Sequence, residues 1–361
     1  IGHLLSIPDW IVYCLCGEMV SEPTTATDLL LLDMRTRQWS ADLLELFGIR
    51  PEWMPAIVPS GTIAGKLQRS AAQQTGLPEG IPVIIGGADT QLGVLGLGCI
   101  RPNALAVIMG SSAPLQVVVD HPRQHPDAAL WTNPHVTPDQ WVIESNAGDS
   151  GLLQDNLLRS IAETFAQLGP STIDARQLLK DLDYELYEHR DRHQARPIAS
   201  LGPMIFHAKN WPVVHGVIKG IDLTAANGIQ PVDLYYALIE NIAYAIRGNF
   251  LQLKTMVQEF SDVRAGGGAM NSPLWQNFLP TVLNTSFDVP DEKEATSIGA
   301  ALLGFVNLGV HRTLADGIQS MIRFTTFHAN QGEQAEHDHR YQKWLEVYQQ
   351  SLGSKNGNKP S

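Results

Sequence analysis

The chain has 361 residues, which is long for one domain and favours two. Apolar residues make up 44% of the chain, which argues against general disorder, and no apolar run reaches the eighteen or so residues of a membrane span. The formal net charge of −12 argues against sequence-independent nucleic-acid binding, because phosphate contacts need a basic surface.

The first eighty residues alternate short helices and short strands. Apolar spacing predicts a helix over residues 7–16, which ends at Gly17 because glycine is the usual residue after a helix. A polar, threonine-rich stretch follows at residues 22–28. Further along this region we expect strands at 29–33 and 61–67 and helices at 41–48 and 68–75.

The first glycine cluster follows an apolar strand predicted at residues 82–85. Gly86 and Gly87 allow a ligand to approach the backbone closely, and Asp89 projects from the strand end as a helix begins. A carboxylate there can act as a general base that takes a proton from a hydroxyl attacking a phosphoryl group. The alternative is that Asp89 only caps the helix.

The second cluster is Gly110-Ser111-Ser112, between two apolar runs that are typical of a hairpin. Backbone N–H groups and two hydroxyls at a glycine turn can bind phosphate. An ordinary hairpin turn is the alternative.

The third cluster is Gly266-Gly267-Gly268, which follows a short predicted strand. Three glycines allow a flat nucleotide to lie against the backbone, and Asn271 can hydrogen-bond its edge. The pattern is neither a P-loop nor GxGxxG. Ser272 and Pro273 are a suitable N-cap and first residue for the next helix.

The remaining pattern completes an alternation of strands and helices. From Pro231 a long helix is predicted with one core face, because apolar residues recur three or four apart. Such alternation predicts an α/β protein whose glycine clusters lie at the carboxyl ends of strands, where open sheets bind ligands. The other expected elements are helices at 149–167, 177–191, 294–309 and 335–352 and a strand at 286–289.

The three clusters in this order resemble the signatures of the FGGY carbohydrate kinases. The resemblance rests on GGADTQLGVLGLG, IMGSS and GGGAMNSPLWQNFLPTVLN, and it extends from the opening DWIVYCLCGE to about residue 350. It implies an actin-like, ribonuclease-H-like α/β fold of two domains, the first incomplete. The expected parts are the end of the family's N-terminal domain (1–100), its ATP-binding C-terminal domain (101–325), a terminal helix (326–352) and a disordered tail (353–361).

The resemblance also implies roles for single residues. Asp89 matches the catalytic base and, with Gly87, is expected to contact the substrate. ATP with Mg²⁺ is the implied cofactor. The residues expected to bind ATP are Gly110, Ser111, Ser112, Gly266, Gly267, Gly268 and Asn271. A final group of residues is expected to let two helices pack closely: Glu294, Ala295, Thr296, Gly299 and Ala300.

The implied reaction is ATP-dependent phosphorylation of a hydroxyl on a small sugar-like molecule. The closest pattern within the family is that of autoinducer-2 kinases, which act on an open dihydroxy pentanedione, with xylulose kinases next. The family's Gly-Glu-Arg segment is absent from FHAKNWPV (206–213), so the substrate stays open. We expect a cytoplasmic protein that binds neither nucleic acid nor membrane, with a homodimer as its expected assembly.

Two rival functions remain. The family's Asp-x-Gly-Thr phosphate motif does not occur in this sequence, so a truncated, inactive nucleotide-binding remnant is one alternative. An actin-like ATPase without a small substrate is the other, although it leaves Asp89 unexplained.

Cysteine and histidine give no sign of a metal site. The cysteines are expected to be reduced and packed in the core: Cys14, Cys16 and Cys99. Three late histidines are expected to be solvated on a charged helix rather than to bind metal: His328, His337 and His339.

Overall fold

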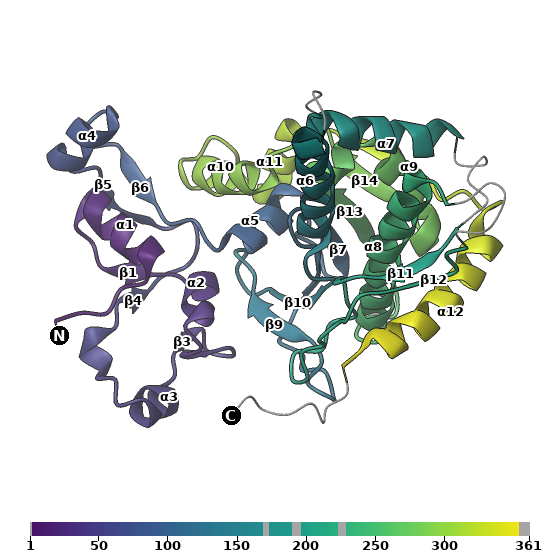
Figure 1. Ribbon diagram of the computed structural model, residues 1–361. Helices are drawn as coiled ribbons and strands as arrows, with labels where there is room; N and C mark the ends of the chain where they lie inside the picture. The colour runs from purple at the N-terminus through teal and green to yellow at the C-terminus, as the bar shows by residue number, and fades with distance from the viewer. Residues whose placement is uncertain (1, 169–172, 190–195, 223–228, 354–361) are drawn as a thin grey trace.

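The computed structural model describes residues 2–168, 173–189, 196–222 and 229–353. Figure 1 shows a large body built around one sheet and, beside it, a group of short elements from the start of the chain. The α/β class predicted from the sequence is confirmed. The sheet strands are β7 (Ala104–Ile108), β8 (Pro114–Val119), β9 (Trp131–Pro134), β10 (Trp141–Asn146), β13 (Asp262–Gly266), β14 (Phe287–Pro290) and β15 (Phe324–Phe327).

The seven strands lie in the order β15-β14-β13-β7-β8-β10-β9. Strands β7, β8, β10 and β9 pair antiparallel, and β7 and β8 are joined by the hairpin that the sequence predicts. Strand β13 pairs parallel with both β7 and β14, and β15 closes the edge antiparallel to β14. The sheet is therefore mixed, and its middle strands are nearly all apolar because helices cover both faces.

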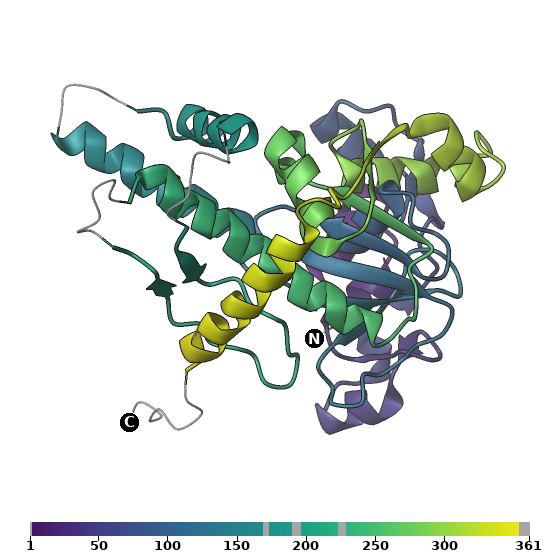
Figure 2. The same ribbon diagram turned by 90° about the vertical axis from the view of Figure 1, so that its right-hand side faces the viewer.

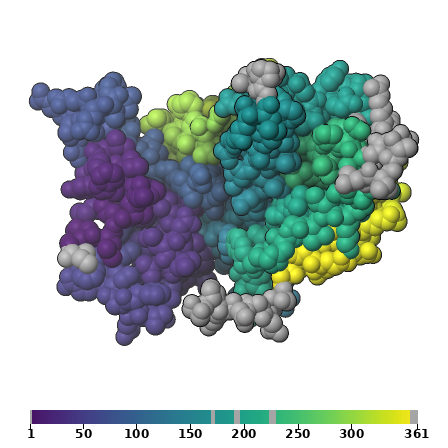
Figure 3. Space-filling view, viewed as in Figure 1, coloured from purple at the N-terminus to yellow at the C-terminus, as the bar shows by residue number. Residues whose placement is uncertain are grey.

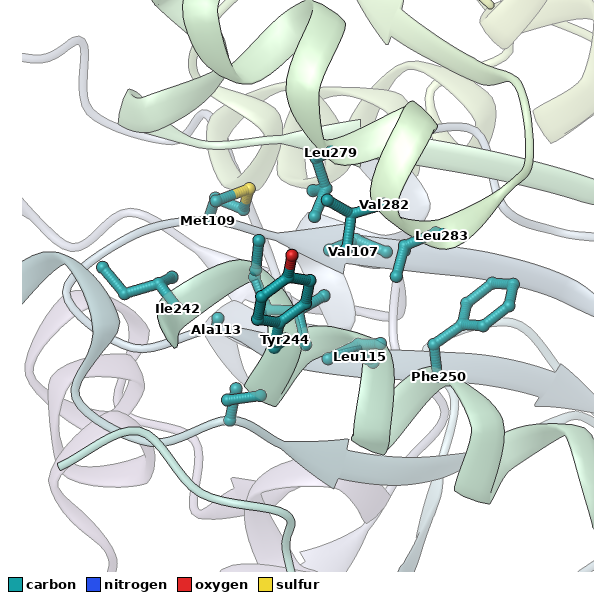
Figure 4. Close-up of a cluster of buried hydrophobic side chains, with 14 of the residues drawn as sticks. Val107, Met109, Ala113, Leu115, Ile242, Tyr244, Phe250, Leu279, Val282 and Leu283 are labelled. Atoms are coloured by element: carbon teal, nitrogen blue, oxygen red, sulfur yellow. The ribbon is translucent and has the colours of Figure 1, made fainter. Parts of the chain in front are cut away.

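One face of the sheet packs against a large helical layer. Figure 4 shows its centre, where Val107 and Leu115 of the sheet meet Ile242 and Phe250 of the long helix α8. Figure 2 shows the last helix, in yellow, crossing α8, and the Trp344 indole donates to Asn241 Oδ1 at 3.1 Å. This layer contains α6 (Ser150–Leu168), α7 (Ala175–His189), α8 (Pro231–Lys254), α9 (Pro273–Leu283) and α12 (Gln334–Ser351).

The opposite face is covered by α5 (Asp89–Gly96), α10 (Ala295–Asn307) and α11 (Leu314–Met321). Helices α5 and α10 touch through their backbones. A Cβ on Gly96 would lie 1.7 Å from the Ala295 carbonyl oxygen, and one on Gly299 would lie 2.0 Å from that of Leu92. Only glycine fits at both positions, so the predicted close packing of small residues is confirmed.

The start of the chain forms only small sheets. Figure 3 shows it as a mass beside the larger body, and its own apolar cluster centres on Leu67, Ala71, Ala72 and Val83. Its elements are α1 (Ile7–Cys16), β1 (Val20–Ser21), α2 (Pro23–Asp28), β2 (Leu32–Asp33), β3 (Gln38–Trp39), α3 (Ala41–Leu46), η1 (Pro51–Trp53), β4 (Ala56–Ile57), β5 (Ile63–Lys66), α4 (Arg69–Thr75) and β6 (Pro82–Ile84). Two short strands, β11 (Ile198–Ser200) and β12 (Val217–Lys219), pair elsewhere.

Residues 22–28, for which no element was predicted, contain helix α2, because the Glu22 carboxylate caps its first turn by accepting from the Thr24 and Thr25 N–H groups at 2.8 and 2.5 Å. Two expectations were wrong. His337 is buried, since its Nδ1 lies 3.1 Å from the Tyr244 hydroxyl inside the helical layer. Cys14 is exposed rather than packed in the core.

The predicted helix at 177–191 is α7, and its last two predicted residues lie outside the described ones. The same holds for all of the predicted tail except residue 353. Among the described residues, no helix is both long and apolar enough to cross a membrane.

Candidate functional site

Asp89 is the first residue of helix α5 and is exposed. The N-cap residue of α5 is Ala88, whose side chain makes no capping hydrogen bond. Asp89 is therefore not the N-cap of this helix, which was the alternative considered for it. Its carboxylate accepts only a local bond, from the Thr90 N–H at 2.7 Å.

The backbone before Asp89 is fixed by close contacts. A Cβ on Gly87 would lie 2.4 Å from Val136 Cγ1, so a side chain there has no room. The Ala88 N–H donates to Thr24 Oγ1 at 2.7 Å, and that hydroxyl donates to Glu22 Oε1 at 2.6 Å. Helix α2 therefore holds the loop from which Asp89 projects.

Two further carboxyls, which the sequence motifs did not indicate, interact with each other, and one of them, Asp28, also interacts with Asp89. Asp28, at the end of α2, is exposed. Partial desolvation of its carboxyl raises its pKa, and the negative charges of Glu22 and Asp89 raise it further. Burial also raises the pKa of Glu144 on β10, and the charge of Asp28 adds to that effect. The signal for Glu144 in the sequence is a single acid inside the apolar run WVIES.

The turn Gly110-Ser111-Ser112 joins β7 to β8 and touches the start of α6. A Cβ on Gly151 would lie 2.3 Å from the Gly110 carbonyl oxygen, and the Leu152 N–H donates to the Ser111 carbonyl oxygen at 3.0 Å. The turn is thus next to a helix N-terminus, where backbone N–H groups and the helix dipole favour anions.

The third cluster lies beside this turn. The Met109 N–H donates to the Gly266 carbonyl oxygen at 2.7 Å, and Met109 directly precedes Gly110. Gly267 has φ of 95°, and a Cβ there would lie 2.4 Å from the Met109 carbonyl oxygen. Glycine is therefore required at Gly267 by both conformation and space.

A cavity of about 250 Å³ opens at the third cluster. Its wall includes glycine backbone and the side-chain amides of Asn271 and Gln276, on η3 (Gly268–Asn271) and α9. A backbone wall with amides at its edge suits a flat, polar base. Gly268 is not among the wall residues. The rest of the wall comprises Met270, Val289, Pro290, Asp291, Glu292, Lys293, Thr325 and Phe327, with Gly266 and Gly267.

The structure thus brings the second and third clusters into direct contact. Asp89 is joined to the same body through α10, since Thr296 Oγ1 donates to the Asp89 carbonyl oxygen at 3.2 Å. Among the described residues, no group of three or more His, Cys, Asp or Glu side chains could hold a metal ion. A divalent cation here would have to share its coordination with a ligand's own oxygens.

Comparison with known proteins gives a consistent family. The model of the FGGY family of carbohydrate kinases, N-terminal domain, matches residues 1–96, and that of the C-terminal domain matches residues 105–308. Among curated proteins, the chain is 33% identical over 351 residues to an autoinducer-2 kinase of Salmonella paratyphi A. That match covers 95% of this chain and 64% of the relative, so the chain spans less than two thirds of the relative's length.

Two further matches agree. An autoinducer-2 kinase of Escherichia coli K12 is 30% identical over 357 residues, which is 96% of this chain and 65% of that protein. The solved structure of a xyloylose kinase from Brucella ovis superimposes with a TM-score of 0.79 at 24% identity, over 97% of this chain and 69% of that one. These structural neighbours have the actin-like ATPase fold of sugar kinases, so the fold predicted from the sequence is confirmed.

Proposed function

Because the chain belongs to the FGGY family of carbohydrate kinases, we propose that it transfers phosphate from ATP to a hydroxyl of a small sugar-like molecule. The observation that carries the proposal is the direct contact between the β7–β8 turn and the β13 glycine cluster, with Asp89 tied to the same body. A phosphate-binding turn, a base-binding cavity and an exposed carboxylate are the parts that such a transfer needs.

Asp89 is the proposed general base. Its carboxylate is exposed at the start of α5, so an acceptor hydroxyl can reach it. In the proposed reaction, the carboxylate takes the hydroxyl proton as the acceptor oxygen bonds to phosphorus and the bond to ADP breaks. Gly87 would contact the acceptor through its backbone, because Val136 fills the space beside its Cα.

The ATP-binding residues divide between two places. Gly266, Gly267 and Asn271 would hold the adenosine in the cavity beside β13, and the adjoining turn at Gly110, Ser111 and Ser112 would hold the phosphates. The neighbouring N-terminus of α6 would attract them. Gly268 would contact ATP through its backbone. No atom lies within 4 Å of the position that a Cβ on Gly268 would take, so neighbouring residues do not require a glycine there.

Mg²⁺ bound with ATP would offset the charge on the transferred phosphoryl group. The described residues offer no cluster of three ligands, so the ion would rest mainly on phosphate oxygens. Asp28 and Asp89 are the carboxyls near enough to each other to interact, and either could complete its coordination.

For the acceptor we propose the open dihydroxy pentanedione form of autoinducer-2, because two autoinducer-2 kinases are 30 to 33% identical over nearly the whole chain. Xylulose is the alternative within the class. A nucleotide-binding remnant without turnover is the alternative from another class.

The deciding experiment measures ATP consumption by the purified chain with dihydroxy pentanedione, xylulose, ribulose or glycerol. Asp89→Asn should lower acceptor-dependent turnover by about a hundredfold to ten-thousandfold, the usual range for a general base. The control is Asp9→Asn, which changes a buried carboxyl that accepts from the Ser6 N–H at the N-cap of α1, away from the proposed site.

Equal turnover in Asp89→Asn and the unchanged chain would contradict the role of Asp89. ATP binding without turnover on any acceptor would favour the remnant.

A further inference from the structure

Glu144 is a buried carboxyl without a cation. Only 6% of the residue is exposed. Its partners are two amides, Gln116 Nε2 at 2.6 Å and Asn146 Nδ2 at 3.5 Å, and the ion pairs of the described residues do not include it. Burying a carboxyl without a cation costs folding free energy, so a functional reason for Glu144 is worth seeking.

The same fold neutralises another buried acid in the usual way. Glu240 on α8 is 3% exposed and forms ion pairs with both Arg196 and Arg340. The partners of Glu144 are amides instead of arginines, so no ion pair among the described residues neutralises its carboxyl.

The Glu144–Gln116 pair interrupts an apolar face. Strand pairing sets Glu144 opposite Gln116, and the next residues on the same face, Val118 and Val142, belong to the core under α5. Gln116 is fully buried, and its Oε1 has no hydrogen-bond partner. A glutamine that served only the core would satisfy both ends of its amide. Here the amide N–H donates to Glu144, and the oxygen has no partner among the described residues, so we infer that the amide positions the carboxyl.

The position of Glu144 relates it to the proposed site. Two residues further along β10, about 6 to 7 Å on, Asn146 pairs with Pro114, and the Ala147 N–H then donates to the Ala113 carbonyl oxygen at 3.0 Å. The strand therefore leads directly to the turn that begins at Gly110. Figure 1 shows α2, α5, β9 and β10 meeting in this part of the molecule.

Glu144 lies on the face of the sheet that α5 covers. It is two residues along β10 from Val142, towards the β7–β8 turn, and α5 begins at Asp89. Asp28 on α2 adds negative charge near Glu144 and interacts in turn with Asp89 and Glu22. The acceptor of the proposed reaction must lie between that turn and Asp89, so Glu144 is on the side of the sheet that the acceptor would approach.

We propose that the Glu144 carboxyl hydrogen-bonds a hydroxyl of the acceptor and selects it, with Gln116 as the positioning residue behind it. This inference rests on the proposed kinase function. The acceptor class is an uncharged polyhydroxylated molecule: hydroxyls match the carboxyl and the unpaired amide oxygen, whereas an acceptor that already carries phosphate or carboxylate would meet Asp28, Asp89 and Glu144 with like charge.

The test compares Glu144→Gln with the unchanged chain, using the same four acceptors and measuring KM for acceptor, KM for ATP and acceptor affinity by calorimetry. Glu144→Gln should weaken acceptor binding at least about tenfold, the loss expected for a hydrogen bond to a charged or buried acid. KM for ATP should stay unchanged. Gln116→Leu should give a smaller loss of the same kind, and Asp9→Asn should give none.

The outcomes separate two failures. Turnover by the unchanged chain with equal acceptor affinity in Glu144→Gln would overturn this inference and leave the kinase function standing. A parallel loss of ATP and acceptor affinity, with a lower midpoint of thermal unfolding, would also overturn it by showing a structural role. Absence of both acceptor binding and turnover in the unchanged chain would overturn the proposed function and this inference together.

Discussion

The two regions of the molecule build their cores in different ways. The larger body packs one large apolar cluster against one face of its seven-stranded sheet and two smaller clusters against the other face. The region before α5 has three two-stranded sheets, β1–β4, β2–β3 and β5–β6, and the four-residue buried cluster around Leu67. It also exposes large apolar side chains such as Trp10 and Phe47. Local stability follows buried apolar contacts, so the first region should open at lower cost than the second.

The largest expected effect separates the two regions directly. Phe278→Ala removes a fully buried ring from the larger core and should lower the free energy of unfolding of that body by about 3–5 kcal/mol. Leu67→Ala should cost about 2–3 kcal/mol, but only for opening of the first region. Hydrogen exchange measured by mass spectrometry distinguishes the two. If both variants lost protection from hydrogen exchange equally throughout the chain, the two regions would unfold as one cooperative unit, and the predicted difference in their stability would be wrong.

A smaller effect is expected where α5 joins the two regions. Gly299→Ala places a methyl group against the Leu92 carbonyl oxygen, which cannot move aside as a flexible side chain could. Overpacking of this kind should destabilise the protein by about 1–3 kcal/mol and reduce turnover, because α5 carries Asp89.

Gly304→Ala on the same helix is the matched control for that prediction. The nearest atom to its Cβ would be Ile84 Cδ1 at 3.9 Å, so the methyl group has room. It should leave stability unchanged or raise it by up to about 1 kcal/mol. Chemical denaturation measures both variants, and an equal loss in the two would mean that α5 and α10 have space to separate.

The smallest effect concerns the pH dependence of stability at the junction of the regions. Burial, with help from Asp28, raises the pKa of Glu144 above its ordinary value of 4.5. The folded state therefore holds this proton more tightly than the unfolded state, and the stability that it contributes is full below pH 4.5 and declines as pH rises through the folded pKa. Glu144→Gln should gain in thermal stability relative to the unchanged chain as pH rises from 4.5 to 7.5.

Asp338→Asn is expected to change in the opposite direction. A hydrogen bond from Arg247 lowers the pKa of Asp338, so its contribution is present above pH 3.8 and is lost as pH falls. The variant should lose thermal stability relative to the unchanged chain at pH 7.5 and approach it in acid. Parallel pH profiles for both variants would mean that neither carboxyl is perturbed in the stated direction.

Local patterns in the sequence sufficed for much of the fold. The core face of α8, the β7–β8 hairpin and the Gly17 helix end follow from spacing and turn chemistry, which act over a few residues. The contact between the Met109 and Gly266 backbones joins distant segments, and the sequence indicated it only through the family resemblance.

The misses have a shared physical cause. Helix α2 depends on Glu22, whose carboxylate also accepts from the Ser60 hydroxyl at 2.9 Å, far along the chain. Burial of His337 depends on Tyr244 of another helix. The sequence showed Glu144 only as an acid within an apolar strand. Its buried hydrogen bond from Gln116 forms only because β8 and β10 pair in the fold. Each depends on a partner that no local pattern reveals.

The pairing of β13 with β7 has a consequence for biosynthesis. Strands β7, β8 and β10 follow one another closely and can pair as soon as they leave the ribosome, whereas β13 joins β7 only after α6, α7 and α8 have been made. Such long-range parallel pairing is slow because a long loop must close first. The proposed nucleotide cavity, which needs Gly266 beside Met109, is therefore among the last features to form, and ATP would find no pocket on a nascent chain that had stopped before β13.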